Sequence, residues 1–119
     1  VYIDDVVEAT YQGIVQETAN HQVFGIGSGV ATTVSTVAST LIAKYGVNVP
    51  VSVTGNYRLG DIRHNYADIS KAKQLLNFVP KYSFEQGITQ FTEWVNQQSI
   101  QKDNYERSMA EMKEKGLFK

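Results

Sequence analysis

Residues 57–88 read YRLGDIRHNYADISKAKQLLNFVPKYSFEQGI, and no other part of the chain holds so many structural signals together. The first twelve of these residues include two arginines, a histidine, a glycine and two acids, with no helical or strand period. Asp68 or Ser70 can cap a short helix that follows, and Pro80 would stop it because proline lacks the N–H that a helix needs. The apolar residues of that helix are Ala72, Leu75 and Leu76. The stretch predicts a charged loop followed at once by a short helix.

Two further helices are predicted toward the C-terminus. Ser83 and Gln86 have the spacing of a capping box, in which each side chain bonds the other residue's backbone. The helix behind them would turn one apolar face inward, formed by Ile88, Phe91, Trp94 and Val95. The polar segment 103–115 carries Tyr105, Met109 and Met112 at helical spacing, which predicts a marginal surface helix lying across a neighbour, and Gly116 would end it.

The N-terminal third predicts alternating strands and helices. Residues 1–3 look like a short strand, and Asp4 and Asp5 stand where the next helix would be capped. That helix would bear four apolar residues, Val6, Val7, Ala9 and Ile14. Residues 23–26 are apolar and predict a second, buried strand, which the glycine-rich turn GIGSG then interrupts.

The longest helical period of the chain runs over residues 34–45, where apolar residues recur every three or four positions. Thr32 or Thr33 can cap its start, and Gly46 can end it in a left-handed conformation. In residues 47–53, valines then alternate with other residues, which predicts a strand, and Pro50 places that strand at a sheet edge. Together these patterns predict an α/β fold with a few-stranded sheet and packed helices.

Composition narrows the function classes. A chain of 119 residues is one domain, and its formal net charge of -1 argues against a nucleic-acid binder. It has no cysteine, and His21 and His64 lie far apart, so we expect neither a disulfide nor a metal site. No run is long enough to span a bilayer and no leader precedes the first strand, so we expect no membrane partner and a cytoplasmic location. The chain begins inside a strand-like run, as a fragment would.

The turn GIGSG does not match the sequence fingerprint of a dinucleotide-binding site. A Gly-x-Gly-x-x-Gly fingerprint needs glycine at its sixth position. That position is Val30 when the count starts at Gly25 and Thr32 when it starts at Gly27. The fingerprint also needs an acid about twenty residues later, and no Asp or Glu occurs between Glu17 and Asp61. We therefore assign no cofactor-binding residue and interpret the turn as one that allows close packing of the following helix.

Arg58 and Asp61 are the main candidate site residues. An arginine fork matches phosphate oxygens, and a carboxylate accepts hydrogen bonds from sugar hydroxyls. Gly60 between them leaves room for a ligand to approach. The alternative is a solvated loop in which the two side chains pair with each other, worth at most ~1 kcal/mol. Nearby, His64 and Tyr66 could bind a substrate or could simply anchor the loop.

Four stretches in order resemble the C-terminal half of the extended short-chain dehydrogenase/reductases, the NAD-dependent nucleotide-sugar epimerases and dehydratases. They are VYIDDVVEA, VFGIGSGVATTVSTVA, residues 57–88 as quoted above, and FTEWV. The resemblance covers residues 1 to about 97, and the tail EMKEKGLFK is similar to that of some bacterial dTDP-L-rhamnose or UDP-glucose 4-epimerases. It implies that Arg58 binds the substrate diphosphate and Asp61 the nucleoside ribose, with Arg63 and His64 lining the same cleft. The ligand would be a UDP- or dTDP-sugar.

The same resemblance implies what the chain lacks. In this family an N-terminal glycine-rich Rossmann part binds NAD, and a Tyr-x-x-x-Lys pair transfers the proton. No tyrosine here has lysine four residues later. Residues 1–119, with a helical tail over residues 100–119, would then be the substrate-binding C-terminal domain of an NAD-dependent epimerase. It would hold no catalytic residue and no cofactor, be inactive alone, and form a homo-oligomer through its exposed junction.

Members of the family commonly have Asn where this chain has Gly25, so the local brace that the amide would supply is absent. The alternatives are a nucleotide-sugar dehydratase or reductase of the same family, and a freestanding protein-interaction domain on the same fold. VYIDDVVEA would form the strand-to-helix passage near the domain junction, where Asp5 caps and braces.

Overall fold

Helices joined by long loops make up the structure, a computed structural model that describes residues 1–100 and 102–118. Gln101 and Lys119, which belong to the predicted tail, lie outside the described residues. The elements are α1 (Ile3–Val15), a 3-10 turn η1 (Glu17–Ala19), α2 (Val34–Tyr45), α3 (Ser70–Leu76), α4 (Phe84–Asn96) and α5 (Tyr105–Glu114). Strand pairing among the described residues is limited to one isolated antiparallel bridge, between Arg58 and Phe118.

The three strands that the sequence predicts do not form among the described residues. Ile3 begins α1, and residues 23–26 and 47–53 run as irregular backbone. Alternating valines supply one apolar face, but a strand also needs a neighbour for its N–H and C=O groups. Residues 47–53 lie beside no such neighbour, and Val53 is 90% exposed. These strand predictions are wrong here, and the few-stranded sheet of the α/β fold class stays a prediction.

The buried residues gather where α1, η1 and α3 meet, together with the loops that cover them. Ala9 of α1 packs with Ala72, Leu76 and Phe78, and Ala19, Phe24 and Ile26 cover this cluster in part. Polar contacts join the same elements, because the amide of Gln16 and the hydroxyl of Thr18 donate to carbonyls at the end of α3. We call residues 2–29 and 67–83 the α1–α3 unit.

Local signals fix the ends of α2 and α4 as the sequence predicts. The side chain of Thr33 accepts the N–H of Thr36, and Gly46 ends α2 in the left-handed conformation at φ 62°. Ser83 and Gln86 form both bonds of the capping box at the start of α4. These three predictions are confirmed, and α2 packs against α4.

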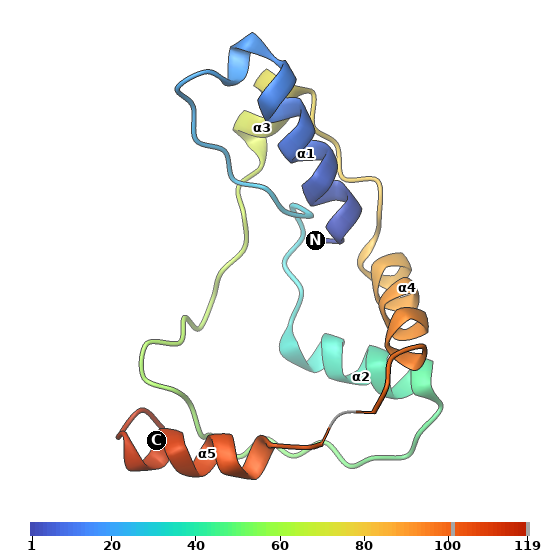
Figure 1. Ribbon diagram of the computed structural model, residues 1–119, viewed down its shortest axis with the longest axis vertical. Helices are drawn as coiled ribbons and strands as arrows, with labels where there is room; N and C mark the ends of the chain where they lie inside the picture. Colours follow the sequence, from blue (N-terminus) through green and yellow to red (C-terminus); the bar gives the residue numbers. More distant parts are fainter. Residues whose placement is uncertain (101, 119) are drawn as a thin grey trace.

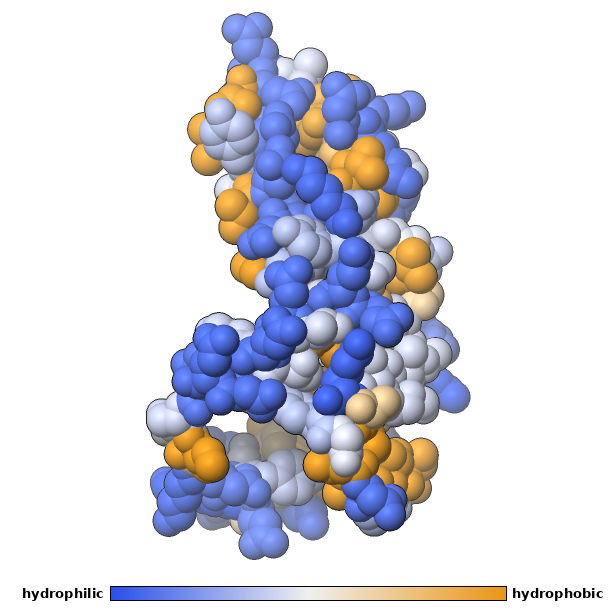
Figure 2. Space-filling view, turned by 90° about the vertical axis from the view of Figure 1, so that its right-hand side faces the viewer, coloured by the Kyte–Doolittle hydropathy of each residue, from blue (hydrophilic) through white to orange (hydrophobic). Residues whose placement is uncertain are grey.

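Outside the α1–α3 unit, the chain is open. The radius of gyration of the whole chain is 18.0 Å, whereas a compact domain of this length has about 14 Å. Figure 1 shows α1 and α3 at one end, α2 and α5 at the other, and α4 leading from one end toward the other. Figure 2 shows apolar side chains in separate patches on one face of the molecule. We call residues 34–66, 84–100 and 102–118 the α2–α5 arc.

Candidate functional site

The loop that carries Arg58 and Asp61 is a tight turn. The N–H of Asp61 donates to the carbonyl of Arg58 at 3.1 Å. Gly60 adopts φ 92°, a conformation that other residues rarely tolerate. The turn therefore brings two side chains three positions apart onto one short segment of exposed chain.

The C-terminal residues hold this loop from the other side. The N–H of Leu59 donates to the carbonyl of Leu117 at 2.9 Å, and Arg58 pairs with Phe118 in the antiparallel bridge. Gly116, at φ 66°, reverses the chain after α5 so that these residues can return to the loop. The predicted tail helix and its glycine stop are confirmed as α5 and Gly116, but the expectation that this helix lies across a neighbouring helix is wrong among the described residues.

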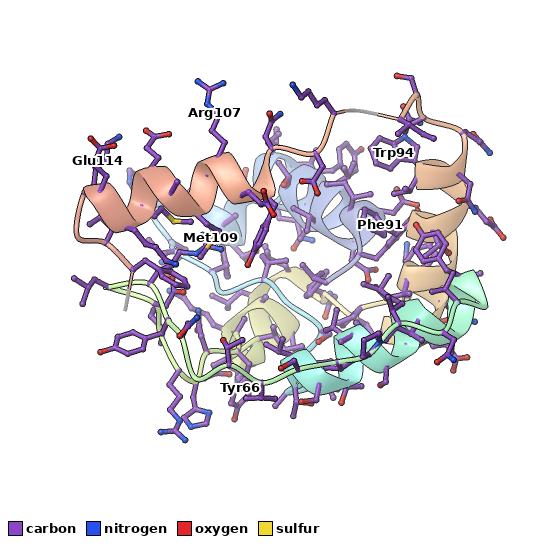
Figure 3. The ribbon with its side chains drawn as sticks, turned by 90° about the horizontal axis from the view of Figure 1, so that it is seen from below. Tyr66, Phe91, Trp94, Arg107, Met109 and Glu114 are labelled. Carbon is purple, nitrogen blue, oxygen red and sulfur yellow. The ribbon has the colours of Figure 1, made fainter. Side chains whose placement is uncertain are left out.

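Between the loop and α5 lies a cavity of ≈ 630 Å³, which we call the Arg58 pocket. One wall comes from the loop, through Thr54, Asn56, Tyr57, Arg58 and Asp61. The other wall comes from α5 and the chain end, through Tyr105, Glu106, Met109, Ala110, Lys113 and Phe118. In Figure 3, Met109 lies on the side of α5 that faces this loop, whereas Arg107 and Glu114 point away from it.

Arg58 and Asp61 do not pair with each other. The ion pairs among the described residues join Lys44 to Glu85, Lys81 to Glu8 and Lys115 to Glu111. The alternative of a mutual Arg58–Asp61 pair is thus not what the structure shows. Both side chains are exposed in the pocket and accessible to a ligand that carries an anion and hydroxyl groups.

The other two predicted site residues lie apart from this pocket. Arg63 and His64 are exposed on the bend that follows Asp61 and do not line the cavity. The structure thus brings Arg58 and Asp61 together but not Arg63 and His64. The sequence analysis did not identify Lys113 or Phe118 as pocket residues. For Lys113 a signal was present, because four-residue steps place Tyr105, Met109 and Lys113 on one helix face.

A second cavity, of ≈ 960 Å³, has a different chemistry. It is lined by residues near the start of α1, the glycine turn and α4, and none of its lining side chains is an Asp, Glu, Lys or Arg. Tyr66 lies here rather than in the Arg58 pocket, together with Phe91 and Trp94. The rings of Phe91 and Trp94 are 6.1 Å apart, and both remain about half exposed. This cavity therefore offers no charged side chain to a phosphate.

The glycine turn packs against the segment before α3. A Cβ on Gly25 would lie 2.5 Å from the carbonyl oxygen of Asp68, and one on Gly27 would lie 2.8 Å from the Cβ of Ala67. This contact explains why a side chain is absent at Gly25. Because Ala67 and Asp68 occupy that side of the turn, the described residues do not fit a dinucleotide there.

Asp5 braces two segments rather than capping its own helix. The N-cap of α1 is Tyr2 and has no side-chain cap bond, so the prediction of an Asp4 or Asp5 cap is wrong. Asp5 is 2% exposed and accepts the backbone N–H groups of Lys81 at 2.8 Å and Tyr82 at 3.3 Å. The bracing role expected of Asp5 is thus confirmed.

Hydrogen bonds shift two pKa values near this brace and near α3. The hydroxyl of Tyr82 donates to Asp4, and this bond, reinforced by the charge of Asp4, raises the pKa of Tyr82 above 10.0. Asp68 accepts the N–H of Ser70 at 2.9 Å, and hydrogen bonds from Ser70 hold the pKa of Asp68 below 3.8. The N-cap of α3 is Ile69 and has no side-chain cap bond, so the prediction of an Asp68 or Ser70 cap is wrong, although Asp68 bonds the first residue of the helix.

None of the helices among the described residues is both long and apolar enough to cross a membrane. Likewise, no three His, Cys, Asp or Glu side chains in the described ranges group together in a way that could hold a metal ion.

Comparison with known proteins links the chain to nucleotide-sugar enzymes. A dTDP-L-rhamnose 4-epimerase of Burkholderia thailandensis is 36% identical over 103 residues, 87% of this chain and 28% of that relative. A UDP-glucuronate 4-epimerase of Thermodesulfobacterium geofontis is 28% identical over 78% of this chain and 28% of its own length. A UDP-N-acetyl-alpha-D-glucosaminuronate decarboxylase of Bacillus cytotoxicus is 29% identical over 78% of this chain and 30% of its own length.

The chain therefore spans less than a third of the length of each of these relatives. No protein-family profile matches it, and no solved structure matches it significantly. The names of the relatives support the nucleotide-sugar epimerase family that the sequence resembles.

Proposed function

We propose that this chain is the substrate-binding part of an NAD-dependent nucleotide-sugar epimerase, in which Arg58 holds the diphosphate and Asp61 a ribose hydroxyl. The observation that carries the proposal is that both side chains, exposed and outside any ion pair of the described chain, line one pocket. The three relatives are named for epimerisation and decarboxylation, and what their names share is a nucleotide-sugar substrate.

The residue types suit these two roles. The planar guanidinium of Arg58 offers paired N–H donors to phosphate oxygens, and such charge-assisted bonds are stronger than neutral ones. The carboxylate of Asp61 accepts hydrogen bonds only, which matches the donor hydroxyls of a ribose. A diphosphate next to a ribose could therefore contact both residues of the turn at once.

The part of the protein described here positions the substrate and does not carry out the reaction. We assign hydride transfer to NAD bound outside residues 1–119, and proton transfer to residues that are likewise outside this chain. The chain alone then shows no turnover, and we propose that the whole enzyme works in the cytoplasm as a homo-oligomer.

Titration calorimetry of the full-length natural protein with UDP and dTDP tests the proposal. Arg58→Ala removes a charge-assisted contact worth about 1.5–3 kcal/mol, so the Kd should rise roughly 10- to 100-fold. Arg63→Ala is the matched control, because Arg63 is an arginine of the same loop outside the pocket, and it should leave the Kd unchanged. Unchanged binding by Arg58→Ala would show that the diphosphate is held elsewhere.

A further inference from the structure

One face of α5 is turned toward the Arg58 pocket. Tyr105, Met109 and Lys113 follow one another at four-residue steps, so they form a stripe along the helix, and all three line the cavity. The opposite side of α5 carries Arg107 and Glu114, which point away (Figure 3). The helix therefore presents one selected set of side chains to the predicted site.

α5 is held against the loop by backbone contacts rather than by a hydrophobic core. Within the described chain it packs on no other helix. The bond from Leu59 to Leu117 and the bridge between Arg58 and Phe118 join the chain end to the residues flanking the turn. Any ligand gripped by Arg58 consequently lies next to α5.

Lys113 is the cation that this face supplies. Its ammonium lies 5.6 Å from the ring centroid of Phe118 and joins no ion pair of the described residues. Lys115, two residues later, is already paired with Glu111 at 2.6 Å. A cation over a ring is held weakly at an exposed site, whereas a phosphate oxygen offers a charge-assisted bond, so Lys113 is free to turn toward a phosphate.

The pocket as a whole carries both signs of charge. Arg58 and Lys113 are its cations, Asp61 and Glu106 its carboxylates. Its aromatic residues are Tyr57, Tyr105 and Phe118. A simple anion would meet repulsion from the two acids, but a ligand with phosphates, donor hydroxyls and a flat base matches all three kinds of group.

We propose that α5 forms the second wall of the nucleotide site, with Lys113 as an additional cation that binds the diphosphate beside Arg58. The inference rests on the proposed function and adds a specificity: the pocket binds a nucleoside diphosphate better than either inorganic pyrophosphate or the nucleoside alone. The C-terminal segment is then a ligand-binding element.

Calorimetry on the full-length natural protein, with UDP, dTDP, uridine and pyrophosphate as probes, tests this assignment. Lys113→Met should raise the Kd for UDP and dTDP about fivefold, the size of one exposed ionic contact, and should leave uridine binding unchanged. Lys113→Arg should restore most of the affinity because it keeps the charge. Lys115→Met is the matched control on the same helix, and its nucleotide affinity should equal that of the unmodified protein.

The outcomes separate the two proposals. If Arg58→Ala weakens UDP binding but Lys113→Met behaves like Lys115→Met, the role of Lys113 is overturned and the proposed function stands. If Arg58→Ala has no effect, or the unmodified protein binds neither nucleotide, both are overturned. Pyrophosphate binding as tight as UDP binding would overturn the specificity for a nucleoside diphosphate. Thermal unfolding of each variant shows whether a loss of affinity reflects a loss of fold.

Discussion

The α1–α3 unit and the α2–α5 arc are built from the same kinds of helix but differ in what surrounds them. The unit contains the buried apolar cluster and the buried carboxylate Asp5. The arc has well-formed helix caps at Thr33 and Ser83, yet its apolar side chains largely face outward, with Val34 85% exposed. Local signals are thus sufficient to form helices in both regions, while the buried apolar cluster lies in only one.

Because of this difference, we expect the residues that stabilise the fold and the residues that bind a ligand to lie in different regions. Side chains that hold the unit together are buried and already bonded to their neighbours, so removing them should affect unfolding. The residues of the Arg58 pocket are exposed and bonded through backbone groups, so replacing their side chains should affect a ligand more than the fold.

The largest effect is expected at Asp5. Asp5→Ala leaves the N–H groups of Lys81 and Tyr82 without their acceptor in a buried place, and the free energy of unfolding should fall by about 3 kcal/mol. Asp61→Ala, an aspartate of the arc that lies exposed, should change it by no more than about 0.5 kcal/mol. Urea unfolding measures both, and equal effects would remove the distinction between the two regions.

A smaller effect is expected at the glycine turn. Gly25→Ala forces a methyl group against the carbonyl of Asp68, a backbone atom with little freedom to move, and should lower the free energy of unfolding by about 2 kcal/mol. Gly13 has open space around it within α1, so Gly13→Ala should instead stabilise by up to about 1 kcal/mol. A neutral Gly25→Ala would contradict the close packing of the turn.

The smallest effect concerns Tyr82 and is a titration. Because the bond to Asp4 raises the pKa of Tyr82, this bond contributes stability below pH 10.0 and the contribution is lost as the pH rises through the raised pKa. Asp4→Asn should bring the phenol pKa back toward 10.0. The ultraviolet absorbance of the phenolate measures it, with Tyr82→Phe identifying the ring that titrates. An unshifted pKa in Asp4→Asn would show that this bond is not made.

Three helix ends whose signals lie within a few residues agree with the sequence prediction, although the predicted Asp4 or Asp5 cap of α1 is wrong. Thr33, Gly46 and the Ser83–Gln86 box each act within one helical turn, and each was predicted correctly. The strand over residues 47–53 failed because an alternating pattern cannot supply the backbone partner that a strand needs. A strand signal therefore depends on distant chain in a way that a helix cap does not.

The candidate site likewise contains residues that a local pattern identifies and residues that only distant contacts bring together. Arg58 and Asp61 could be identified from the sequence because they lie three positions apart around Gly60. Lys113 could not, because it reaches the pocket only through the contact between Leu59 and Leu117, more than fifty residues apart in the chain. Asp5 likewise bonds residues 76 and 77 positions away; the resemblance implies a brace at Asp5, but the sequence does not identify these partners.

A crystal structure of the full-length natural protein with dTDP tests the central claim most directly. The account predicts phosphate oxygens within about 3 Å of the Arg58 guanidinium and a ribose hydroxyl within about 3 Å of the Asp61 carboxylate. A nucleotide bound elsewhere, with both of these side chains facing only solvent, would contradict it.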